Sequence, residues 1–97
     1  MTFAELKALD HQYTMQTYGR FDVALDHGQG ATLYGLEGET YTDFASGIGV
    51  ASLGYGHPAW IKAVEDQAHK LGHASNLFYT EPYAKLADVL CRRAGMA

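Results

Sequence analysis

Residues 54–59, which read GYGHPA, have the spacing in this chain that is most readily tied to chemistry. They match the pattern G-x-G-x-x-A, follow an apolar run over residues 48–53, and lead into an expected helix. This arrangement is typical of dinucleotide sites, where backbone N–H groups at a helix start hold a pyrophosphate. However, Pro58 removes one such N–H, and no strand with an acidic end follows. A dinucleotide site is therefore a minor alternative.

Two histidines have a spacing that metal sites use. His69 and His73 are four residues apart, which places two imidazoles on one face of a helix. Gly72 lies between them and is a helix stop signal, and a third ligand would have to come from a distant histidine. We expect no metal site.

The side chains that serve as nucleophiles or bases do not form a constellation here. Ser46 precedes Gly47 without a G-x-S-x-G pattern around it, and Cys91 falls in the middle of an expected helix. The four lysines all fall on helical faces that we expect to be exposed. We therefore assign no catalytic residue to this chain.

The elements that would position these residues begin with a helix and a small sheet. Apolar residues at three- and four-residue spacing predict a helix over residues 2–17, with Thr2 as its cap and Gly19 as its stop. Alternation and glycine turns then predict three short strands, at residues 21–27, 31–36 and 39–44, with turns at residues 28–30 and 37–38.

A glycine-rich loop and two helices complete the expected fold. Four glycines fall within residues 47–56, among apolar residues, which favours an ordered loop over a flexible linker. Prolines in their first turns and glycines after their last residues predict helices over residues 58–71 and 80–94. The fold class is α+β: an N-terminal helix, a small three-stranded antiparallel sheet, the Gly-rich loop and two helices, with the helices covering the sheet thinly.

Length and composition limit the function classes. The 97 residues form one domain at most, with 47% hydrophobic residues and a net charge of -4. The charge is not clustered, which argues against nucleic-acid binding. The N-terminus does not read as a signal peptide, and no apolar stretch is long enough to span a membrane. We expect a cytoplasmic protein.

Several motifs, in order and spacing, resemble one enzyme family. Residues 30–58 read GATLYGLEGETYTDFASGIGVASLGYGHP, and residues 75–82 read SNLFYTEP. Together they resemble the N-terminal region of class III (fold type I) pyridoxal-phosphate aminotransferases, most of all acetylornithine aminotransferases. The family patterns are Y-x-D-F-x-x-G-I-x-V and L-G-H-x-H-P. Tyr55 departs from the second pattern at its first histidine, and Leu36 and Glu37 stand where a turn aspartate is common.

The resemblance implies a role within a larger enzyme. It implies that residues 1–97 are the N-terminal segment of a longer homodimeric chain, joining its C-terminal part in the small domain. The cofactor lysine and the carboxylate-binding arginine would lie beyond this segment. The full enzyme would use pyridoxal 5'-phosphate to transfer an amino group from N-acetylornithine, a small amino acid, to 2-oxoglutarate in arginine biosynthesis. By itself the segment would be inactive and would not hold the cofactor stably. An ornithine or 4-aminobutyrate type remains an alternative.

The resemblance also indicates which residues would line the site. Those expected at the edge of the substrate pocket are Tyr18, Ser46, Gly47 and Ile48. Those expected in the link that approaches the cofactor or the neighbouring subunit are Asn76, Phe78 and Tyr79. An aliphatic Ile48 would leave apolar room for an acetyl group, where ornithine-type relatives are expected to carry a bulky aromatic. The alternative for each residue is loop packing, because loops carry both structural and binding residues.

A hypothesis from another class remains open beside the enzyme. The chain has seven tyrosines and one tryptophan, and such amphipathic rings are enriched at interfaces. A stand-alone, non-catalytic oligomerisation or binding module would bury them in a homodimer.

Overall fold

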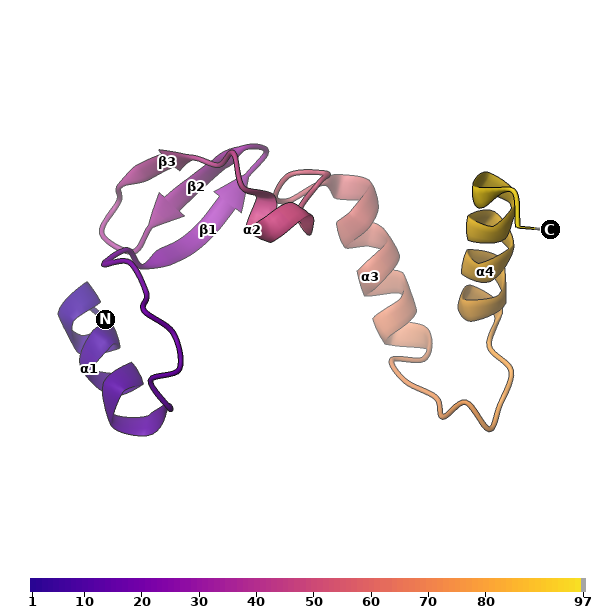
Figure 1. The fold of residues 1–97 in the computed structure, drawn as a ribbon, viewed down its shortest axis with the longest axis horizontal. Coiled ribbons are helices and arrows are strands. Elements are labelled where there is room, and N and C mark those ends of the chain that lie inside the picture. The colour runs from indigo at the N-terminus through magenta and orange to yellow at the C-terminus, as the bar shows by residue number, and fades with distance from the viewer. Residues whose placement is uncertain (97) are drawn as a thin grey trace. The chain divides into compact units, whose positions relative to one another are not determined.

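The computed structural model describes residues 1–96 and divides the chain into two compact units, Met1–Ile61 and Lys62–Ala97. The first unit holds helix α1 (Phe3–Tyr13), strands β1 (Leu25–Gln29), β2 (Thr32–Gly35) and β3 (Thr40–Thr42), and the short turn α2 (Ser46–Gly49). Helix α3 (Pro58–Lys70) starts in the first unit and ends in the second, where α4 (Glu81–Ala94) follows. Figure 1 shows this order along the chain, and the predicted α+β class is confirmed.

Helix α1 has a complete capping box but ends earlier than predicted. The Thr2 side chain accepts the Glu5 N–H at 3.3 Å, and the Glu5 carboxylate accepts the Thr2 N–H at 2.7 Å. The predicted end near residue 17 is wrong, because Thr14 is extended and both its N–H and its hydroxyl donate to the Asp10 carbonyl at 2.9 Å. The hydroxyl competes for the backbone acceptor and terminates the helix before Gly19 is reached.

The sheet is antiparallel with strand order β1-β2-β3, as predicted, but its first strand is displaced. Residues 21–23 alternate correctly yet form a tight turn, in which the Val23 N–H donates to the Phe21 carbonyl at 2.8 Å. Pairing with β2 therefore starts only at Leu25, and the turn predicted at residues 28–30 moves to Gly30 and Ala31. His27 and Tyr34 pair across β1 and β2, with their rings stacked at 4.4 Å.

The first unit has almost no core. Among residues 1–96 only Gly35, at the end of β2, is buried, and every large apolar side chain of β1 to α2 is partly or fully open. Helix α1 meets the rest of its unit through polar contacts, such as the hydrogen bond from the Phe3 N–H to the Glu37 carboxylate at 3.2 Å. The expectation that α1 would cover the sheet is therefore wrong, because α1 does not pack an apolar face onto it.

The two long helices follow their sequence signals closely. Pro58 occupies the first position of α3, and Gly72 follows two residues after its end. Helix α4 starts after Thr80 and ends at Gly95, which adopts the left-handed conformation with φ 67°. Both helices keep exposed apolar faces; Leu86, Val89 and Leu90 of α4 are each more than half exposed. Cys91 of α4 is also exposed. No helix within residues 1–96 is long and apolar enough to cross a membrane.

Candidate functional site

The glycine-rich stretch begins with a turn of left-handed backbone at α2. Four consecutive residues have positive φ: Ser46 52°, Gly47 58°, Ile48 63° and Gly49 78°. Left-handed helical geometry costs roughly 1–2 kcal/mol for each residue with a Cβ, and a β-branched residue rarely adopts it. Ser46 and Ile48 are the two residues of this turn that carry that strain. Such outliers cluster at functional loops. The Ile48 side chain is 96% exposed, so no side-chain packing holds it in place.

Backbone and carboxylate contacts hold this turn instead. The Gly49 N–H donates to the Ala45 carbonyl at 3.0 Å, and the Ala51 N–H donates to the Ser46 carbonyl at 2.8 Å. At the start of the turn, Asp43 Oδ1 accepts the N–H groups of Ala45 and Ser46 at 2.8 and 3.0 Å. One carboxylate oxygen therefore satisfies the two amides that enter the strained turn.

The other oxygen of Asp43 binds Tyr55, twelve residues further on. The Tyr55 hydroxyl donates to Asp43 Oδ2 at 2.7 Å. This hydrogen bond, followed by those from the Ala45 and Ser46 N–H groups, holds the pKa of the Asp43 carboxyl below its ordinary value. The same hydrogen bond raises the pKa of the Tyr55 phenol, because the ionised carboxylate favours the protonated phenol.

Tyr55 is fixed at its backbone as well as at its hydroxyl. Its N–H and carbonyl pair with Gly30 in an antiparallel bridge, with N···O distances of 2.8 and 2.9 Å. Its ring lies over Gly28, where an added Cβ would be 2.6 Å from the ring carbon Cγ. Gly28 therefore has to be a glycine because the ring occupies the space of a side chain. We call Asp43, Tyr55, Gly28 and Gly30 the clamp.

The clamp also bears on the dinucleotide alternative. The N–H groups of Gly54, Tyr55 and Ala59 donate to Ala51, to Gly30 and to the His57 ring at 2.9, 2.8 and 3.2 Å. Pro58 has no N–H to offer. A pyrophosphate would find these donors already in use, so the geometry disfavours a dinucleotide here. Within the described part of the chain, no three His, Cys, Asp or Glu side chains converge as a metal site.

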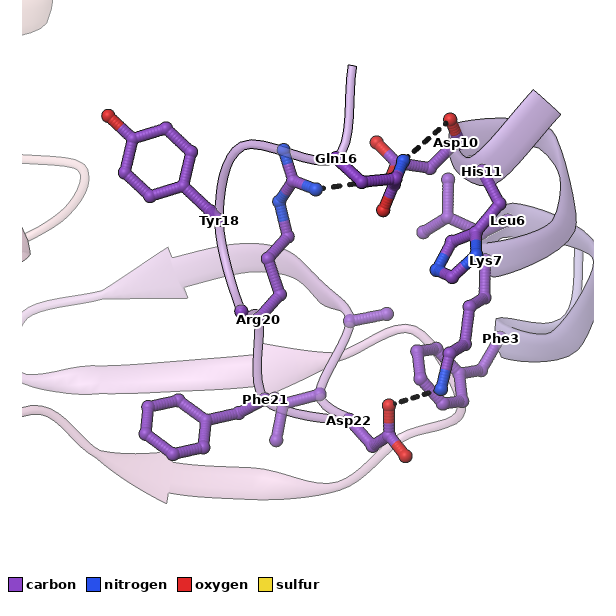
Figure 2. Close-up of a pocket in the computed structure, with 13 residues that line it drawn as sticks. Phe3, Leu6, Lys7, Asp10, His11, Gln16, Tyr18, Arg20, Phe21 and Asp22 are labelled. Carbon is purple, nitrogen blue, oxygen red and sulfur yellow. Dashed lines mark hydrogen bonds and ion pairs between the residues drawn. The ribbon is translucent and has the colours of Figure 1, made fainter. Parts of the chain in front are cut away.

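Tyr18 lies in a separate part of the first unit. A cavity of about 430 Å³ lies between α1 and residues 16–24, and Tyr18 is among the residues that line it. Figure 2 shows its ring directed away from α1, while Lys7 reaches Asp22 at 2.6 Å and Arg20 reaches Asp10 at 3.1 Å across the cavity. The cationic groups there are thus already paired with carboxylates.

The predicted cofactor-side residues lie in the second unit, in the link before α4. A turn over residues 75–78 closes with the Phe78 N–H donating to the Ser75 carbonyl at 3.0 Å. Asn76 and the rings of Phe78 and Tyr79 are exposed. The rings are open to contact, but these three residues form no enclosed cradle among themselves.

The lysines test whether this segment could anchor pyridoxal phosphate. An anchoring lysine must present a neutral amine in a protected site. Lys7, Lys62 and Lys85 instead form exposed ion pairs with Asp22, Asp66 and Glu81. Lys70 is likewise exposed at the end of α3. The lysines among the described residues therefore do not fit the anchor of this cofactor.

The structure thus brings together some of the residues named from the sequence. Ser46, Gly47 and Ile48 form one turn, while Tyr18 belongs to a different loop of the same unit. The roles of these residues, and of Asn76, Phe78 and Tyr79, stay predictions. Sequence reasoning missed the clamp, although Asp43 of the Y-x-D-F motif and the departure at Tyr55 were both visible.

An α+β segment with this order of helices and strands is also found in a known enzyme family. The family model described as aminotransferase class-III matches residues 13–96, and the chain belongs to this family. The acetylornithine aminotransferase of Haemophilus ducreyi is 53% identical over 96 residues, which cover 99% of this chain and 24% of that protein.

Solved structures agree on the fold. Acetylornithine aminotransferase from Elizabethkingia anophelis superposes with a TM-score of 0.91 at 26% identity, over 98% of this chain and 25% of that one. Ornithine aminotransferase from Toxoplasma gondii ME49 gives 0.90 at 28% identity, over 98% of this chain and 22% of that one. The chain thus spans about a quarter of the length of the relatives it matches.

Proposed function

We propose that this chain acts as the N-terminal segment of a pyridoxal-phosphate-dependent transaminase. The whole enzyme would transfer an amino group from N-acetylornithine to 2-oxoglutarate, a step of arginine biosynthesis, as a cytoplasmic homodimer. When bound in the whole enzyme, the cofactor supplies the electron sink for this chemistry. The segment contributes the substrate-side turn and the exposed link, and by itself it is inactive.

Sequence identity, more than fold, supports N-acetylornithine as the donor. Fold likeness to the acetylornithine and ornithine enzymes is nearly equal, with TM-scores of 0.91 and 0.90. In the comparison by sequence, the acetylornithine aminotransferases of Haemophilus ducreyi, Synechocystis sp. and Wolinella succinogenes are 53%, 49% and 48% identical to this chain. The exposed aliphatic Ile48 on the left-handed turn is consistent with a donor that carries an apolar acetyl group.

The test is a chimera. Residues 1–96 replace the matching quarter of the Haemophilus ducreyi acetylornithine aminotransferase, and glutamate formation is measured with N-acetylornithine, ornithine and 4-aminobutyrate as donors. We expect the highest kcat/KM with N-acetylornithine. A higher value with ornithine or 4-aminobutyrate would move the assignment to those types.

The exposed apolar faces of α3 and α4 support a second candidate function, the stand-alone oligomerisation or binding module. Size-exclusion chromatography of the isolated chain, with a dye for exposed apolar surface, separates the two hypotheses. A compact dimer that leaves no apolar surface open favours the module. A chain that binds the dye strongly favours a segment of a larger enzyme.

A further inference from the structure

The left-handed turn at Ser46–Gly49 lacks the support that usually fixes a loop. Ile48 is 96% exposed and Phe44, which precedes the turn, is 95% exposed, so neither side chain packs against the sheet. Within this segment, the direction of Ile48 is therefore set by the backbone. A strained backbone persists only when the surrounding contacts over-determine it.

Those contacts converge on a single carboxylate. Asp43 holds the entry of the turn through the Ala45 and Ser46 amides, and its own N–H donates to the Ala31 carbonyl at 2.8 Å. Hydrogen bonds to an ionised acceptor are the stronger ones. Asp43 thereby connects the β1–β2 turn to the first amide of the strained segment.

Tyr55 fixes Asp43 from the opposite side. Its backbone is paired to Gly30 and its ring rests on Gly28, so its hydroxyl has little freedom to move away from Oδ2. The family pattern carries a histidine at this position, and an imidazole N–H is also a hydrogen-bond donor. Tyrosine in this chain therefore keeps a donor, on a longer and doubly held side chain.

We propose that Asp43 and Tyr55 are positioning residues that orient Ile48 at the mouth of the amino-donor site and so tune the choice of donor. This inference rests on the proposed function. Neither residue touches the reacting atoms; each acts through the turn. A small displacement of a substrate-facing group is enough to change turnover strongly, and apolar contacts discriminate donors by their shape.

The experiment uses the chimera and two variants. Tyr55→Phe keeps the ring on Gly28 and removes only the hydroxyl, whereas Asp43→Asn removes the charge. We measure the ratio of kcat/KM for N-acetylornithine to that for ornithine, and expect both variants to lower it at least about five-fold. Tyr55→His, which restores a donor, should recover most of the ratio. Asp26→Asn, an exposed aspartate paired with His27 on β1, is the matched control and should leave the ratio unchanged.

A second readout separates positioning from general stability. Hydrogen exchange at the Ala45 and Ser46 amides should speed up in Tyr55→Phe, while the unfolding temperature of the chimera stays the same. If activity falls equally for both donors, with an unchanged ratio, the residues are structural only and the inference is wrong. If the parent chimera does not transaminate N-acetylornithine at all, the proposed function fails, and the inference fails with it.

Discussion

Substituting Gly28 tests the clamp most directly, because no charged group is involved. In the Gly28→Ala variant the new Cβ would be 2.6, 2.8 and 2.9 Å from three carbon atoms of the Tyr55 side chain. Ordinary contact requires at least 3.4 Å, so the ring has to move by roughly 0.5–0.8 Å. The ring cannot simply swing aside, since its backbone is paired with Gly30 and its hydroxyl with Asp43.

The expected cost follows from overpacking. Forcing an additional carbon into a filled site destabilises by about 1–3 kcal/mol. The strain falls on the Gly30–Tyr55 bridge, so we expect local opening of this bridge to become easier by that amount. Protection of the Gly30 and Tyr55 amides against hydrogen exchange should therefore fall by about 5-fold to 150-fold.

The assay is amide hydrogen exchange of the chimera, comparing Gly28→Ala with Gly72→Ala. At Gly72 an added Cβ would have no neighbour within 4 Å and the φ angle is not in the left-handed region, so this variant should leave protection of the bridge unaltered. Combining Gly28→Ala with Tyr55→Gly should remove all three close contacts, including the one with the Tyr55 Cβ, and a double-mutant cycle measures the strain that is relieved. Equal protection in Gly28→Ala and Gly72→Ala would refute the clamp geometry.

Two further predictions concern the same region. First, the hydrogen bonds to the Asp43 carboxylate lower its pKa. Their contribution to the free energy of unfolding is complete at pH values above the ordinary pKa of 3.8 and is lost as the pH falls through the lowered pKa. Tyr55 has a raised pKa, so its contribution is complete below 10.0 and is lost as the pH rises through the raised value; an ultraviolet titration that places the Tyr55 phenol at or below 10.0 would contradict this. Second, Gly47→Ala puts a Cβ into open space at φ 58°, so the backbone alone should cost about 1–2 kcal/mol. We expect faster exchange of the Gly49 amide, and unchanged exchange would mean that the turn is not left-handed.

Local sequence signals were sufficient to predict the ends of helices α3 and α4. Pro58 and Gly95 act on the few residues beside them, through a missing N–H and a permitted left-handed angle, so they predicted helix ends to within a residue or two. The Thr2 cap of α1 was predicted for the same reason. The end of α1 was missed because Thr14, an ordinary-looking residue, uses its hydroxyl to compete for the Asp10 carbonyl.

Contacts between residues that are far apart in the sequence account for the remaining differences between the predicted and the observed structure. The alternation at residues 21–23 was real, yet a strand needs a partner, and pairing with β2 starts at Leu25. The sequence could place Ser46, Gly47 and Ile48 in one loop, but not assign them to a left-handed turn.

By itself, the sequence determined the family, the α+β class, the order of the elements and the boundaries of the two long helices, because these depend on short-range patterns and on matching motifs. Only the tertiary structure showed that Asp43 and Tyr55, twelve residues apart, share a hydrogen bond, and that Gly28 lies under the Tyr55 ring. Such contacts arise when the chain folds back on itself. No local propensity encodes the distance between two side chains that meet across a loop.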